Sequence, residues 1–203
     1  MHQLITFHNK VRIHYSLILV LILSLYIGKY IEILSLLSIL LLHEIGHIFF
    51  MIIFNQRLSR ITITAVGGVI DVDYNISNTK QLIVNLGGLI VNAILYIVLY
   101  FYDYEGSLFN YNRLILLVNS LPIYPLDGNR VLSNILNYFK PKALITRIEL
   151  FISTCFLSLF LLYNIINKNF GLLLIGIYLI YRNVCFYVVI NDIIVKKIIN
   201  SIK

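Results

Sequence analysis

Long apolar runs alternate with short polar segments along the whole of this chain. The runs lie near residues 13–28, 31–54, 80–101, 111–135, 143–165 and 170–192. A helix needs roughly 20 mostly apolar residues to cross the hydrocarbon core of a bilayer, and these runs approach or exceed that length. The pattern therefore predicts an all-α membrane protein with about six transmembrane helices.

One segment departs from this pattern. The β-branched residues Ile61 to Thr64 lead into Gly67-Gly68 and then into the alternating segment Val69 to Asp73. Alternation around a glycine pair is typical of two short strands joined by a turn. We expect a small β-hairpin or sheet near residues 60–73. No linker rich in Pro, Gly or Ser divides the chain, which favours a single polytopic domain over residues 1–203.

Composition and charge support the membrane interpretation. Of the 203 residues, 60% are hydrophobic and 12% are charged, and the net charge is +7. Most basic side chains lie at or near every second loop, whereas Lys29, Arg113 and Lys168 fall on the opposite side and Arg182 lies within the sixth run. Basic residues favour the cytoplasmic side, so both termini should be cytoplasmic. Because these charges flank apolar runs and form no cluster, nucleic-acid binding is not expected.

The second apolar run contains the sequence His43-Glu44-Ile45-Gly46-His47. On a helix, residues four apart differ by about 40° and about 6 Å, so both imidazoles can bind one ion. This H-E-x-x-H pattern is typical of zinc peptidases, in which the glutamate is the general base. The alternative is a structural cluster of polar side chains, although ionisable residues within membrane spans are usually functional.

A zinc site of this kind needs a third protein ligand, and Asp127 is the best candidate. If the second and fourth runs cross the membrane in the same direction, Asp127 lies at about the depth of the histidines. Pro122 and Pro125 should break the helix before it, and Gly128 follows it. The alternative is an aspartate that caps a helix or lies at the membrane interface.

A second motif carries a resemblance to a known family. Asn119, Pro122, Leu126, Asp127 and Gly128 form N-x-x-P-x-x-x-L-D-G. Together with H-E-x-x-H, this resembles the site-2 protease family of intramembrane zinc metalloproteases. The resemblance implies one Zn²⁺ per chain, bound by His43, His47 and Asp127. It also implies that Asn119 lines the active site, where it either hydrogen-bonds the substrate carbonyl or oxyanion or satisfies the broken backbone.

The resemblance extends to a six-span subgroup that includes a sporulation protease. It implies a membrane-associated regulatory substrate, specifically a sigma-factor precursor, together with membrane inhibitory partners and a location in the bacterial cell or forespore membrane. The pattern contains neither a PDZ nor a CBS domain. Two alternatives stay open: a general site-2 protease with another substrate, and a non-catalytic zinc-binding membrane protein, either a transporter or an inactive homologue.

Overall fold

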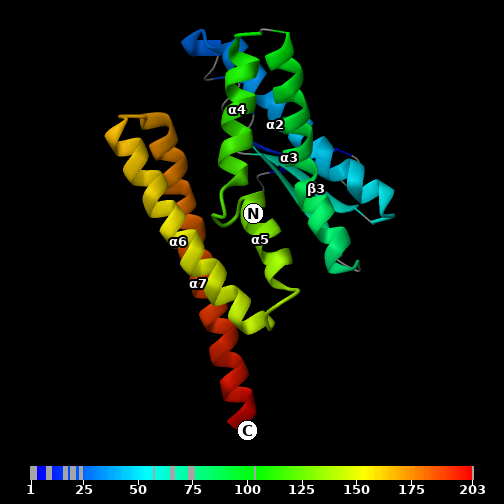
Figure 1. Ribbon diagram of the computed structural model, residues 1–203, viewed down its shortest axis with the longest axis vertical. Helices are drawn as coiled ribbons and strands as arrows, with labels where there is room; N and C mark the ends of the chain where they lie inside the picture. The colour runs from blue at the N-terminus through cyan, green and yellow to red at the C-terminus, as the bar shows by residue number, and fades with distance from the viewer. Residues whose placement is uncertain are drawn as a thin grey trace. The chain divides into compact units, whose positions relative to one another are not determined.

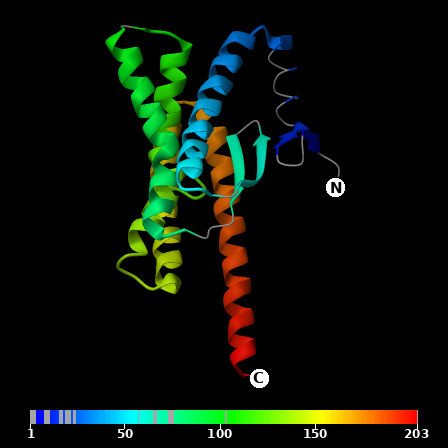
Figure 2. The ribbon, with the colours of Figure 1, turned by 90° about the vertical axis from the view of Figure 1, so that its right-hand side faces the viewer.

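The computed structural model describes residues 4–7, 11–15, 18, 22, 25–56, 58–64, 67–72, 76–102 and 104–202. The chain divides into two compact units, Met1–Val118 and Asn119–Lys203. The first unit combines a small sheet with helices, whereas the described part of the second is helical. Figures 1 and 2 show the ribbon in two orientations.

The sheet of the first unit has four strands in the order β1-β2-β3-β4. They are β1 (Leu4–Phe7), β2 (Val11–His14), β3 (Leu58–Thr64) and β4 (Gly67–Val72). The pairs β1–β2 and β3–β4 are antiparallel, whereas β2 and β3 are parallel. A parallel pair needs a long crossover, and here the connection contains helix α2 (Tyr30–Ile53).

Helix α2 packs closely against α3 (Asn78–Phe101). Each helix has 24 residues, so each is about 36 Å long and exceeds the hydrocarbon thickness. The contact is close because glycines face each other. A Cβ added at Gly87 would lie 2.5 Å from the carbonyl oxygen of Gly46. Helix α4 (Ser107–Ser120) follows, and its Asn112 amide donates to the Asn92 carbonyl at 2.9 Å.

The second unit begins at the end of α4. The irregular segment 121–126 leads to α5 (Asp127–Leu136), and α6 (Lys142–Ile166) and α7 (Phe170–Ile202) follow. Helices α6 and α7 lie side by side after a short connection, as Figure 1 shows. A small core forms where Ile123 of the irregular segment contacts Leu157 and Leu179. This core attaches the segment to both long helices.

Four described helices are long and apolar enough to cross a membrane: Tyr30–Ile53, Asn78–Phe101, Leu144–Ile166 and Phe170–Val189. They correspond to the second, third, fifth and sixth runs. The expected fold class, all-α with about six spans, is therefore wrong. The fourth run fails as one helix because 121–126, with its two prolines, separates α4 from α5. The first run begins within β2, and much of it lies outside the described residues.

Candidate metal centre

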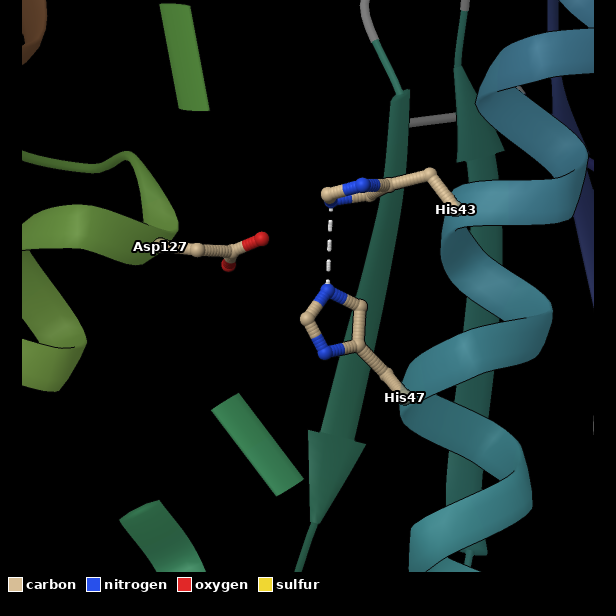
Figure 3. A group of neighbouring side chains, drawn as sticks. All are labelled: His43, His47 and Asp127. Carbon is tan, nitrogen blue, oxygen red and sulfur yellow. Dashed lines mark hydrogen bonds between the residues drawn. The ribbon is translucent and has the colours of Figure 1, made fainter. Parts of the chain in front are cut away.

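The two histidines of the H-E-x-x-H segment lie on one face of α2. Both are buried, with 3% and 5% of their surfaces exposed, and their Nε2 atoms are 3.3 Å apart. Figure 3 shows the two rings in an edge-on arrangement, with a dashed line between these nitrogens. Two nitrogens at about 2.05 Å from a tetrahedral zinc ion would be about 3.3 Å apart. The separation therefore matches one edge of a zinc coordination tetrahedron.

The tautomer of His47 is fixed by helix α3. Its Nδ1 lies 2.8 Å from the backbone carbonyl oxygen of Val84. A carbonyl oxygen accepts hydrogen bonds and cannot donate them, so Nδ1 carries the proton and donates it. In the neutral ring, Nε2 then carries the lone pair, which is the form that binds a metal. The backbone of α3 thus leaves Nε2 of His47 in the form that can bind a metal.

Helix α3 also leaves space beside the two nitrogens. A Cβ added at Gly88 would lie 2.6 Å from Nε2 of both His43 and His47. Glycine is therefore the residue that fits here while both rings keep their positions. The orientation of His47 and the space beside Nε2 fit a bound zinc ion.

Glu44 and Asn119 are less buried than the histidines. Glu44 is half-buried and follows His43 directly on α2. Asn119 is half-buried in the last turn of α4, at the first position of the second unit. Both side chains are thus accessible enough to meet water or a substrate.

Asp127 belongs to the second unit, where it is the first residue of α5 and is 5% exposed. A carboxylate in the first turn is favoured by the helix dipole. Its Oδ1 lies 3.6 Å from the guanidinium of Arg130, whose side chain is half exposed. Gly128 allows this turn to begin tightly, because a Cβ there would collide with the carbonyl oxygens of Ser120 and Leu121.

Val84 and Gly88 were not among the site residues predicted from the sequence. Val84 contributes a backbone carbonyl, for which its side chain gives no signal. Gly88 lies in a Gly87-Gly88 pair, and such pairs in apolar helices usually indicate helix packing. Gly87 has that packing role, whereas Gly88 faces the histidines.

Comparison with known proteins shows what this chain is similar to. Residues 31–105 match the model of Peptidase family M50. The chain is 30% identical over 159 residues to stage IV sporulation protein FB of Bacillus subtilis (strain 168), a match that covers 72% of this chain. The chain spans about half the length of that curated relative, 54%.

A solved structure shares the fold. The site-2 protease from Methanocaldococcus jannaschii matches with a TM-score of 0.66 and 23% sequence identity. The match covers 88% of this chain and 91% of that one.

Proposed function

Because the chain belongs to the site-2 protease family, peptidase family M50, we propose that it is an intramembrane zinc endopeptidase that cleaves a membrane-associated regulatory protein. The observation that carries this proposal is the pair of buried histidines, whose Nε2 atoms are spaced as two zinc ligands. The four apolar helices and the family make the chain an integral membrane protein.

We propose that His43, His47 and Asp127 hold one zinc ion per chain. Two imidazoles and one carboxylate are a common ligand set of catalytic zinc, which leaves a fourth position open. In support, each of these three side chains is buried and offers one ligand atom, a ring nitrogen or a carboxylate oxygen (Figure 3). When bound, zinc lowers the pKa of water in the open position to about 7 and polarises a carbonyl.

Glu44 is the proposed general base and acid. Its half-buried carboxylate lies next to His43 in the sequence, so it can meet water at the metal centre. It accepts a proton from the attacking water and then donates that proton to the leaving amine nitrogen of the cut peptide bond. General acid–base catalysis of this kind contributes roughly 10² to 10⁴-fold.

Asn119 is proposed to bind the substrate. Its amide would donate a hydrogen bond to the substrate carbonyl as negative charge develops on the oxygen. The half-buried position of Asn119 at the end of α4 leaves its amide able to meet a substrate.

For the substrate, we propose a sigma-factor precursor. The similarity to a protein named for sporulation supports this choice over a general site-2 protease with another substrate. We further propose that both termini are cytoplasmic, that the enzyme lies in the bacterial cell or forespore membrane, and that membrane proteins inhibit it. The excess of basic residues in alternate loops supports this orientation.

The test is cleavage of a membrane-tethered sigma-factor precursor that is co-expressed with the chain in heterologous membranes. Wild type should cut it, whereas Glu44→Gln should bind zinc but lose cleavage by at least about 100-fold. Asp127→Ala should bind zinc more weakly and lose cleavage. Gly171→Ala is a control, because a Cβ there meets nothing within 4 Å.

The outcomes of this test separate a peptidase from a non-catalytic zinc-binding protein. The chain could bind zinc and yet cut neither this precursor nor any other membrane-associated regulatory protein tested. That result would favour the alternative of a non-catalytic zinc-binding protein. Equal cleavage by wild type and Glu44→Gln would exclude Glu44 as the base. A wild-type chain that binds no zinc would overturn the proposal as a whole.

A further inference from the structure

The segment 121–126, which ends next to Asp127, has few hydrogen bonds of its own. The Ile123 N–H donates to the Leu121 carbonyl at 2.8 Å, and the Leu126 N–H donates to the Ile123 carbonyl at 2.7 Å. Both backbone groups of Tyr124 instead bind side chains of the two long helices. The path of this segment therefore depends on α6 and α7.

Two buried polar residues make these bonds. The Tyr124 N–H donates to Ser153 Oγ at 2.9 Å, and the Ser153 hydroxyl donates to Asn183 Oδ1 at 2.6 Å. The Asn183 amide nitrogen donates to the Tyr124 carbonyl at 2.8 Å and to the Leu179 carbonyl at 2.9 Å. Ser153 is fully buried and Asn183 is 5% exposed. We call Ser153 and Asn183 the segment clamp.

Every polar atom of the clamp has a suitable partner. The amide nitrogen of Asn183 faces two carbonyl oxygens, which only accept, and its oxygen faces a hydroxyl that can donate. A flipped amide would place an acceptor against two acceptors. Buried polar groups in apolar helices are costly when unpaired, so their pairing with both backbone groups of Tyr124 indicates a specific purpose.

Apolar contacts from the same helix faces hold the side chains of the segment. Ile123 is fully buried against Leu157 and Leu179, which lie one turn from Ser153 and Asn183 respectively. The Tyr124 ring stacks on Phe186 at 4.1 Å between centroids, with an angle of 13° between planes. Helices α6 and α7 thus fix both the backbone and the side chains of the segment.

We propose that Ser153 and Asn183 are positioning residues that fix the direction of the Asp127 carboxylate. Asp127 lies three residues after Tyr124, and the intervening chain has little freedom. Pro125 has a fixed φ, and the Leu126 N–H is bonded back to Ile123. A shift at Tyr124 is therefore passed on to the start of α5. This inference rests on the proposed role of Asp127 as a zinc ligand.

The experiment measures zinc affinity of the full chain in detergent by competition with a chelating dye. Ser153→Ala removes the hydroxyl, and Asn183→Asp keeps the size of the side chain but replaces both donors with an acceptor. Residues that orient metal ligands typically contribute 10 to 100-fold in affinity, so each variant should bind zinc about 10 to 100-fold more weakly. Asn164→Ala is the matched control, because Asn164 is fully buried in α6 and donates to Phe160 in its own helix.

A double-mutant cycle tests whether the clamp acts through Asp127. In an Asp127→Ala background, Ser153→Ala should cause no further loss of zinc affinity. An equal further loss would show that the clamp acts on zinc by another route and would overturn the proposal. Wild-type affinity in both clamp variants would also overturn it. The clamp variants could also lose no more zinc affinity than Asn164→Ala does at the same loss of thermal stability. That result would give the clamp a merely structural role and would overturn the proposal as well.

The cycle also separates this inference from the proposed function. If Asp127→Ala itself leaves zinc affinity unchanged, the assignment of Asp127 as a ligand fails and the clamp proposal fails with it. If Asp127→Ala loses zinc but the clamp variants keep it, the clamp proposal fails alone.

Discussion

Replacement of Gly88 by alanine tests the metal centre with a single added methyl group. The new Cβ would lie 2.6 Å from Nε2 of both His43 and His47, whereas ordinary van der Waals contact begins at 3.4 Å. The rings or the helix must therefore move by about 0.8 Å. Retreat of helix α3 would open the close packing of Gly87 on Gly46 one residue away, which opposes that movement.

The movement must come largely from the rings, and it should prevent zinc binding. Metal–ligand distances are specific to about 0.2 Å, so a displacement of about 0.8 Å takes a nitrogen out of reach. The Val84 hydrogen bond also opposes rotation of the His47 ring. We expect Gly88→Ala to weaken zinc binding by at least about 100-fold, which corresponds to about 2.7 kcal/mol.

The assay is zinc competition on the detergent-solubilised chain, followed by precursor cleavage at saturating zinc. Gly171→Ala is the control, because it makes the same change in an apolar helix where the added Cβ meets nothing within 4 Å. Wild-type zinc affinity in a folded Gly88→Ala chain would refute the assignment of the Nε2 atoms as the ligand atoms.

Three further outcomes are expected. Gly87→Ala should lower the thermal unfolding temperature and reduce the free energy of unfolding by about 1–3 kcal/mol, because the new Cβ meets the Gly46 backbone. A melting curve equal to that of Gly171→Ala would contradict this expectation. Asn112→Ala should lower the free energy of unfolding by about 1 kcal/mol, because it removes the hydrogen bond between α4 and Asn92. An unchanged chemical denaturation curve would contradict this expectation. Chelation of zinc from a sample with free zinc at 100 times its Kd should lower the free energy of unfolding by about 2.7 kcal/mol, and added zinc should restore it. Calorimetry that shows identical melting with and without zinc would exclude a bound ion.

The long helices and the histidine pair could be predicted from the sequence because their signals are local. A long apolar run without an internal proline indicates a span, and a four-residue spacing places His43 and His47 on one helix face. The break before Asp127 was also predictable, since Pro122 and Pro125 cannot donate within a helix. These patterns need no information about the rest of the chain.

The features that escaped prediction are non-local. Strand β2 pairs with β3 across more than forty residues, and its four residues adjoin the first apolar run, which conceals them. The Val84 carbonyl carries no side-chain signal, so no pattern indicates that it meets His47. Ser153 and Asn183 look like isolated polar residues in apolar helices until the fold brings Tyr124 between them.

The hydrogen bond from His47 to the Val84 carbonyl has a consequence for how substitutions act. An orienting side chain can be lost by a single mutation, whereas a backbone carbonyl persists under any replacement that preserves the helix. Val84 is buried with 2% of its surface exposed, so alanine there should weaken packing while the tautomer of His47 stays unchanged. At this position the side chain therefore serves packing, whereas the peptide carbonyl orients His47.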